Sequence, residues 1–229
     1  MNKINKTNES TWSNHYRQKK ERPTLNPEGF IVRLLTSKFP SQVVTDIDYK
    51  GKKVLDLSCG YGRNLGFLKN LEFDLYATEI TEEIVQSLKE NISGVDFQTG
   101  KANQLPFKDN FFDGIVACNS CYYLDEDVCF ADNLLEIQKK IKPGGWFIGS
   151  IIKASHTGLK DAEWLEDGSA IVRQDQLQLR NGYRLHYANS IQHTKEMLSP
   201  NFKNITIGEF SDNLMGFRRD FFYFHAEKK

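Results

Sequence analysis

The stretch VLDLSCGYGRN, residues 54–64, decides the fold. Its mostly apolar start predicts a short buried strand, and the glycines that follow predict a tight turn into a helix over residues 63–70. Small residues in such a turn let the backbone bend sharply and let a ligand approach main-chain N–H groups at the start of a helix. This geometry suits nucleotides in general, although a glycine-rich turn that binds nothing fits the same residues.

Strands and helices alternate through the first two thirds of the chain. Apolar runs predict strands and amphipathic runs predict helices; the strands fall at 73–78, 95–98, 111–118 and 145–152, and the helices at 27–38, 81–91 and 125–140. Thr81 is expected to cap its helix, and Leu134, Leu135 and Ile137 are expected on the core side of theirs. This alternation indicates a parallel sheet.

The last third changes character. Residues 176–179 and 183–187 alternate in polarity around Asn181-Gly182, which predicts a hairpin outside the main sheet. A short helix over 190–199 is followed by two strands, at 204–209 and 220–224. Strands this close in sequence can pair only in antiparallel fashion.

Composition narrows the classes of function. The chain has 229 residues, with 30 Lys and Arg balanced by 30 Asp and Glu. No net field draws it to a polyanion or an anionic membrane, so neither nucleic acid nor membrane is expected as a partner. The polar start lacks the apolar centre of a secretory signal, and no apolar run has the length of a membrane span, which together predict a cytoplasmic protein.

Glu79 is the second candidate for ligand binding. It ends the strand after the glycine-rich turn, about 20 residues downstream, where a carboxylate can accept hydrogen bonds from both hydroxyls of an adenosine ribose. An acid there could instead cap the following helix. Because Thr81 already supplies that cap, we favour a ligand contact for Glu79.

These landmarks together resemble the class I methyltransferases, which use S-adenosyl-L-methionine, and in particular their small-molecule members of the type 11/25 kind. The glycine-rich stretch resembles their first motif and Glu79 their ribose-binding acid. Residues 102–107 resemble their A-x-x-L-P-F segment, 111–113 the opening of their fourth strand, and 142–145 the turn before their fifth. Each piece is weak by itself, but their occurrence in the family's order is specific.

The resemblance implies a Rossmann-like α/β fold with a seven-stranded, mostly parallel sheet whose last strand is antiparallel. We expect a single domain over residues 1–229. Within it, the expected parts are an N-terminal helical lid (1–40), a cofactor-binding core (50–152), an inserted segment with the hairpin (153–189), and a C-terminal helix with the antiparallel strand pair (190–229).

The resemblance also implies which residues bind S-adenosyl-L-methionine and its product S-adenosyl-L-homocysteine. The expected contacts are Tyr16, Arg33, Asp56, Ser58, Gly60, Gly62, Asn64, Glu79, Ile80, Ala102, Asn103 and Asn119. Residues of the glycine-rich turn surround the methionine part, Ala102 and Asn103 the adenine, and Asn119 the sulfonium. In the lid, Arg33 suits the cofactor's carboxylate through its planar fork, although an ordinary surface arginine fits that position equally well.

Two positions depart from the family pattern. Ser58 replaces the usual first glycine, and it is small enough that we expect binding to survive. Lys101 stands where an acid commonly precedes Ala102, which removes the usual hydrogen bond to adenine and leaves Asn103 as a substitute.

Methyl transfer from a sulfonium is an in-line displacement that needs no protein nucleophile. A hydroxyl acceptor needs a base, and the candidates are His15, His156, His186 and His193, with Tyr122 and Tyr123 after the fourth strand. His156 and His186 lead because they lie near where the family accommodates acceptors, and Tyr122 is the next candidate. A structural role explains each of them as well.

A metal site is not expected. Cys118 and Cys121 are spaced like half of a zinc site, but no second Cys/His pair accompanies them. Nor does Asn119-Ser120-Cys121-Tyr122 contain the prolines of the [DN]-P-P-[YF] motif of base-methylating relatives. We therefore expect a small-molecule acceptor, such as a sugar or a precursor of a secondary metabolite, methylated on oxygen or nitrogen.

Two other functions remain open on sequence grounds. A binding or regulatory protein that keeps the fold without catalysis would have the same motifs. An NAD-linked oxidoreductase is less compatible, because Gly60, Gly62 and Gly66 do not give the spacing G-x-G-x-x-G and because the terminal strand pair is antiparallel.

Overall fold

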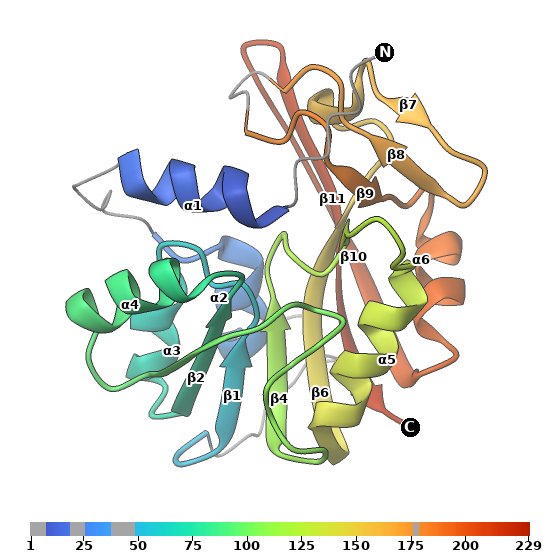
Figure 1. Cartoon of the computed structure of the whole chain (residues 1–229). Helices are drawn as coiled ribbons and strands as arrows, with labels where there is room; N and C mark the ends of the chain where they lie inside the picture. Colours follow the sequence, from blue (N-terminus) through green and yellow to red (C-terminus); the bar gives the residue numbers. More distant parts are fainter. Residues whose placement is uncertain (1–7, 19–25, 38–48, 176–178) are drawn as a thin grey trace.

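The computed structural model describes residues 8–18, 26–37, 49–175 and 179–229 of the chain (Figure 1). A seven-stranded sheet forms its centre, in the order β10-β11-β6-β4-β1-β2-β3. The strands are β1 (Lys53–Asp56), β2 (Asp74–Glu79), β3 (Asp96–Thr99), β4 (Phe112–Ala117), β6 (Ile141–Ile152), β10 (Phe202–Leu214) and β11 (Phe217–Lys228). β11 is antiparallel to both of its neighbours, whereas the other pairs are parallel. The predicted sheet is thus confirmed.

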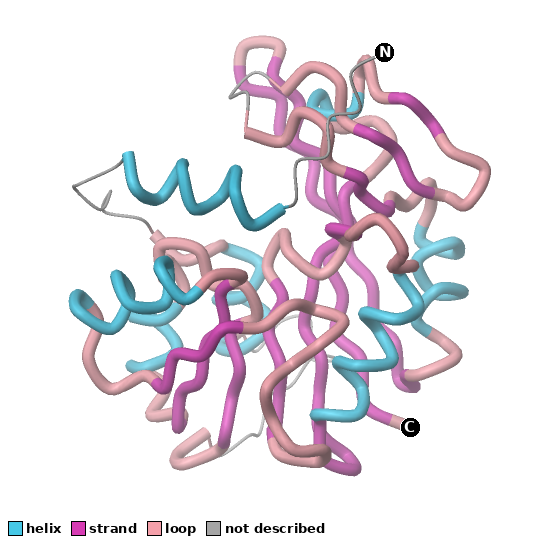
Figure 2. The backbone as a smooth tube through the Cα atoms, viewed as in Figure 1, coloured by secondary structure: helices cyan, strands magenta, loops and turns pink. Residues whose placement is uncertain are grey.

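Helices cover both faces of this sheet, which explains why its central strands are apolar throughout (Figure 2). Successive residues of β1 point to opposite faces of the sheet. Val54 packs with α2 (Gly29–Thr36) and α3 (Leu65–Asn70) on one face. Leu55 packs with α5 (Phe130–Lys140) and α6 (Ile191–Leu198) on the other. α4 (Glu82–Asn91) packs on Ala77 of β2. Its predicted cap is present, since Thr81 Oγ1 accepts the N–H of Ile84 at 3.4 Å.

α5 differs from the prediction at its start and on one face. It begins at Phe130 rather than at residue 125, and the N–H of Cys129 donates to the Asp132 carboxylate at its first turn. Leu134 and Ile137 are buried as expected, but Leu135 is 45% exposed. The buried stripe follows the helical period, and position 133 completes it: Asn133 is buried and its side chain donates to the carbonyls of Cys121 and Tyr123.

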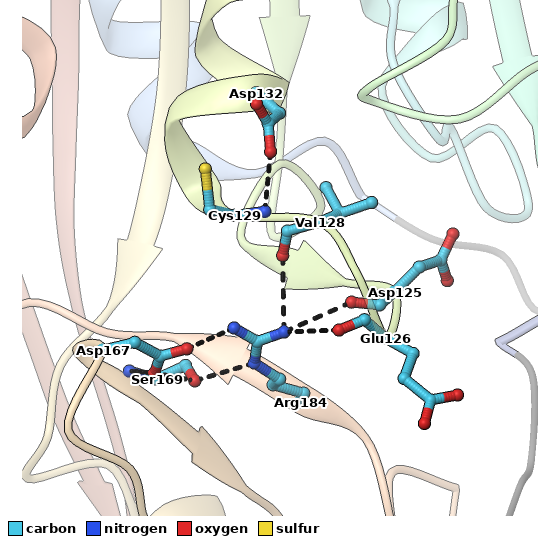
Figure 3. A network of polar contacts seen from close by, with 8 residues as sticks. All are labelled: Asp125, Glu126, Val128, Cys129, Asp132, Asp167, Ser169 and Arg184. Atoms are coloured by element: carbon cyan, nitrogen blue, oxygen red, sulfur yellow. Dashed lines mark hydrogen bonds and ion pairs between the residues drawn. The ribbon is translucent and has the colours of Figure 1, made fainter.

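A second, antiparallel sheet lies beyond the carboxyl end of the main one (Figure 2). It is made of β5 (Tyr123–Leu124), β9 (Arg184–His186), β8 (Ser169–Ile171) and β7 (Glu163–Trp164), in that order, and a short 3₁₀ turn, η1 (Thr157–Leu159), precedes β7. Arg184 ties this sheet to the segment before α5 (Figure 3): its guanidinium donates to Ser169 Oγ and to the carbonyls of Asp125, Glu126 and Val128, and pairs with Asp167.

One strand of the predicted hairpin is present, since β9 forms within residues 183–187, and it pairs with β8. Residues 176–178 of the predicted partner strand lie outside the described part of the chain, and Leu179 lies in a bend. The Asp175 carboxylate explains the bend, because it accepts the N–H groups of Leu179 and Arg180 and so turns the backbone locally.

α1 (Asn8–Gln18) lies across the carboxyl end of the main sheet (Figure 1). This end is where ligands bind in open α/β sheets. Among the described helices, none has both the length and the apolar character that a membrane span requires.

Candidate functional site

A cavity of about 340 Å³ lies between α1 and the carboxyl ends of β1, β2 and β4. Seven of the predicted cofactor contacts line it: Asp56, Ser58, Gly60, Asn64, Glu79, Ile80 and Asn119. Topology alone brings them together, since neighbouring parallel strands end at the same edge of the sheet. We call it the first cavity.

The glycine-rich turn has a left-handed backbone where the motif requires it. Gly60 and Gly62 have φ angles of 62° and 78°, and Ser58 has the same hand at 53°. A Cβ atom at Gly62 would lie 2.7 Å from Ile92 Cδ1, so no larger residue fits there without a shift. A left-handed backbone at a non-glycine residue such as Ser58 lowers the stability of the fold by roughly 1 kcal/mol. The turn is fixed to β2, since Cys59 N donates to the Thr78 carbonyl at 3.0 Å.

Glu79, at the end of β2, is hydrogen-bonded to this turn. Its Oε1 accepts the N–H of Gly60 at 2.6 Å, and its Oε2 accepts the N–H of Ile80 at 3.1 Å. Each carboxylate oxygen keeps a second lone pair that can accept a ligand hydroxyl. Burial raises the pKa of Glu79 to about 7, against the two N–H groups, which lower it.

Asp56 is a buried carboxyl group without a complete set of partners. Its exposed fraction is 1%, and its Oδ2 has no hydrogen-bond partner among the described residues. Burial, with a smaller contribution from the charge of Glu79, raises the pKa of Asp56 to about 8. Buried polar atoms are rarely left unsatisfied in native proteins, so this oxygen is available to a donor group of a ligand.

α1 closes the first cavity from above. Trp12 and His15 line it, and the Trp12 ring contacts Tyr123 and Tyr183 with centroid distances of 6.3 and 6.4 Å. Ser13 Oγ lies 3.0 Å from Thr81 Oγ1, which fixes the helix to the cap of α4. The side chain of Tyr16, predicted to contact the cofactor, lies outside the described part of the chain.

Lys101 has a different role from the acid it replaces. Its Nζ pairs with Glu9 of α1 at 2.7 Å and with Asp125 at 3.0 Å, so it joins α1 to the segment after β5. Neither Ala102 nor Asn103 lines the first cavity. Their contact with adenine therefore stays a prediction.

An arginine lines the first cavity, but it is not the one that was predicted. Arg33 does not line the first cavity; it lines a second one. Arg63, in the glycine-rich stretch itself, lines the first, where its Nη1 pairs with Glu28 and its Nε donates to the Asn26 carbonyl at 3.2 Å. The signal for Arg63 was its position at the start of a helix that follows a ligand-binding turn.

The second cavity, of about 290 Å³, lies between α2 and the strands β10 and β11. Its walls include the aromatic rings of Phe30, Phe210, Phe221 and Tyr223, and its polar groups include Glu28, Arg33, Arg219 and His225. Asn119 lines both cavities and is held by Ser150, whose Oγ accepts the N–H of Asn119 and donates to its Oδ1, both at 2.9 Å.

Comparison with known proteins agrees with this geometry. Residues 55–149 match the family model described as a methyltransferase domain. Residues 55–149 thus carry a methyltransferase domain. The sheet order and the single antiparallel strand match the Rossmann-like methyltransferase fold.

Relatives by sequence match the methyltransferase domain over part of their length. A probable phthiotriol/phenolphthiotriol dimycocerosates methyltransferase 2 of Mycobacterium ulcerans is 32% identical over 132 residues, 54% of this chain and 47% of that protein. A fatty-acid O-methyltransferase of Mycolicibacterium smegmatis is 29% identical over 105 residues, 44% of this chain and 37% of that protein. The chain thus spans less than half the length of these two relatives.

Solved structures of similar fold cover more of the chain. A SAM-dependent methyltransferase of Methanosarcina mazei has a TM-score of 0.63 at 15% identity, covering 89% of this chain and 99% of its own. A 1,6-didemethyltoxoflavin-N1-methyltransferase of Burkholderia thailandensis, with bound S-adenosylhomocysteine, has a TM-score of 0.56 at 16% identity, covering 79% of this chain and 72% of its own. At these identities the likeness shows the fold.

Of the predicted bases, His15 and Tyr123 line the first cavity, whereas the leading candidates His156, His186 and Tyr122 line neither cavity. His156 is 2% exposed, and its Nδ1 accepts the N–H of Gly158 at 2.9 Å to cap η1. His186 stacks on Phe130 at 4.7 Å. Burial lowers the pKa of each imidazole to about 4. Tyr122 is buried against Tyr123, and burial raises the pKa of its hydroxyl well above the usual value.

His225 was not among the predicted histidines. It lies in β11 and lines the second cavity, and its Nε2 has no hydrogen-bond partner among the described residues. No motif surrounds it, so only the pairing of β11 with β10 and β6 reveals its place. Within the described residues, no group of three His, Cys, Asp or Glu side chains could hold a metal ion.

Proposed function

We propose that this chain is an S-adenosyl-L-methionine-dependent methyltransferase that acts on a small molecule. The single observation that carries the proposal is the buried Asp56 carboxyl group with an unpartnered oxygen, 340 Å³ of cavity in front of it, and Glu79 clasping the turn beside it. An ammonium group and a vicinal diol are the ligand groups that these two acids fit, and S-adenosyl-L-methionine has both.

Different side chains bind different parts of the cofactor. Asp56 accepts from the ammonium group, and the free lone pairs of Glu79 accept from the two ribose hydroxyls. The carboxylate contact, predicted for Arg33, belongs in this proposal to Arg63, because Arg63 lines the first cavity and Arg33 does not. The five donors of a guanidinium allow Arg63 to keep Glu28 while it binds a second carboxylate.

The cofactor supplies an electrophilic methyl group on a positively charged sulfur. The protein's contribution is alignment and exclusion of water. Trp12 and His15 cover the first cavity, so α1 acts as a lid. Asn119, rigid through its two hydrogen bonds with Ser150, stands in the wall that both cavities share and orients an acceptor that approaches from the second.

The acceptor class follows from the second cavity and from the relatives. Its aromatic walls favour an apolar acceptor over a sugar. Relatives matched by sequence are named as a phthiotriol/phenolphthiotriol dimycocerosates methyltransferase and a fatty-acid O-methyltransferase. The location in the cytoplasm and the lack of a nucleic-acid partner stay predictions from composition.

Calorimetric titration with S-adenosylhomocysteine tests the proposal. Glu79→Ala is expected to weaken binding at least tenfold, since a charged acceptor of two hydroxyls is lost. Asp212→Asn, an exposed acid of β10, serves as the matched control and keeps wild-type affinity. Tighter binding of NADH than of S-adenosylhomocysteine by the folded wild-type protein would refute the proposal in favour of an oxidoreductase.

A further inference from the structure

The second cavity is an elongated groove on one face of the β10–β11 ribbon. Three cross-strand pairs form its floor: Thr206 with His225, Gly208 with Tyr223, and Phe210 with Phe221. The four-residue step from Phe221 to His225 gives the groove a length of about 13 Å at the usual rise of a strand. Such a length suits a chain-like molecule more than a compact one.

Aromatic packing keeps this groove apolar. Phe30 of α2 stacks on Tyr223, with ring centroids 5.6 Å apart and an interplanar angle of 23°. Gly208 makes room for the Tyr223 ring, because a Cβ atom at that position would lie 2.4 Å from ring atoms of Tyr223. Phe30 of α2 and Tyr223 of the floor thus form an apolar contact across the groove.

One charge at the groove is unbalanced. Glu28 pairs with both Arg63 and Arg219, and Glu209 pairs with Lys153 at 2.6 Å. Arg33 is exposed on α2 and lines the groove, yet it has no ion pair with any described residue. His225 adds no second positive charge, since burial lowers the pKa of its imidazole. Of the two arginines in the groove lining, Arg33 is therefore the one whose charge no described acid pairs, and it lies next to apolar walls.

The groove meets the first cavity at a defined point. Asn119 lines both, and the backbone N–H of Glu28, at the start of α2, donates to Asn64 Oδ1 at 3.1 Å. Asn119 is thus part of the wall of both cavities, and the Glu28–Asn64 hydrogen bond joins a residue of the groove to a residue of the first cavity.

From this geometry we propose that the groove holds the methyl acceptor, and that the acceptor is an elongated apolar molecule with an anionic group that Arg33 binds. The proposal rests on the proposed function and makes Arg33 a specificity residue for the acceptor instead of a ligand of the cofactor. A guanidinium is suited to this role, because its planar fork pairs with a carboxylate in a fixed orientation.

The experiment compares decanoate with 1-decanol, which share an alkyl chain and differ in charge, each titrated below its aggregation limit into protein saturated with S-adenosylhomocysteine. Wild type is expected to bind decanoate more tightly than decanol. Arg33→Met, which keeps a long apolar side chain, is expected to weaken decanoate binding about tenfold or more and to leave decanol unchanged. Arg173→Met, an exposed arginine outside the groove, is the matched control and should change neither.

A second variant locates the binding. Thr206→Phe fills the floor beside His225 and should weaken both probes while S-adenosylhomocysteine still binds. The proposal is overturned if Arg33→Met binds decanoate like wild type, if wild type does not prefer decanoate, or if Thr206→Phe changes neither probe. It is also overturned if Arg33→Met weakens S-adenosylhomocysteine, as a cofactor ligand would. If the wild-type protein does not bind S-adenosylhomocysteine, the proposed function is refuted instead.

Discussion

At the scale of single residues, two acids at the ends of β1 and β2 carry the account. Both have a raised pKa, about 8 for Asp56 and about 7 for Glu79, because burial disfavours their charged forms. A cationic ligand group and hydroxyl donors reverse that preference, since they stabilise the carboxylates. Ligand binding and proton release are therefore coupled at this site.

Binding of S-adenosylhomocysteine near pH 7 should release protons. Asp56 is mostly protonated in the free protein at that pH and must ionise to pair with the ammonium group, so affinity should increase from pH 6 to pH 8. Calorimetry in buffers with different ionisation enthalpies measures the release. Asp56→Asn should reduce it, and a binding enthalpy that does not depend on the buffer would contradict the assignment.

The raised pKa of Asp56 also makes the free energy of unfolding depend on pH. With Asp56 protonated in the folded state and ionised in the unfolded state, the free energy of unfolding falls as pH rises from about 4 to about 8, by at most about 1.4 kcal/mol per pH unit. Urea denaturation at several pH values should show a flatter profile for Asp56→Asn. The Asp212→Asn control should keep the wild-type slope, and an equal slope in both variants would exclude Asp56 as the cause.

A substitution of Ser58 tests the backbone strain in the glycine-rich turn and removes no charged group. Its φ of 53° costs roughly 1 kcal/mol, so Ser58→Gly should increase the free energy of unfolding by up to about 1 kcal/mol, less the entropy that glycine adds to the unfolded chain. Glu72→Gly, at a φ of 62° on the surface, is the comparison and should behave alike. A Ser58→Gly protein that is clearly less stable than wild type would show that the serine hydroxyl matters more than the backbone.

At the scale of elements, the alternation of apolar and amphipathic runs predicted the sheet well because each strand between two helix layers must be apolar. The pairing of β9 with β8 was not predicted, because the alternation of polarity around Asn181-Gly182 indicated a nearer partner, of which residues 176–178 lie outside the described part of the chain. Leu135 was misplaced because an apolar residue beside the buried stripe looks the same in sequence as one within it.

The lid helix α1 gives the prediction that belongs to this scale. Trp12→Ala removes the ring that lines the first cavity and contacts Tyr123 and Tyr183, so it should weaken S-adenosylhomocysteine about tenfold, mainly through faster dissociation. Stopped-flow displacement measures that rate. Trp164→Ala, an exposed tryptophan of β7, is the control, and equal dissociation rates in the two variants would contradict the closing role of α1.

At the scale of the whole molecule, the sheet order brings together residues that sequence patterns cannot connect. Asp56, Glu79 and Asn119 were predictable because they sit beside recognisable strand ends. Arg219 and Glu28, at opposite ends of the chain, meet only because β11 inserts between β10 and β6 and α2 covers it. His225 and the placement of Arg33 depend on the same long-range pairing, so the second cavity could not be predicted.

Binding of the cofactor in the first cavity through Asp56 and Glu79 is tested most directly by a crystal structure of the protein with S-adenosylhomocysteine. Both ribose hydroxyls are expected within hydrogen-bond distance of the Glu79 carboxylate, and the ammonium group is expected on Asp56 Oδ2. A ligand that occupies another site, or that leaves the Asp56 oxygen without a partner, would contradict it.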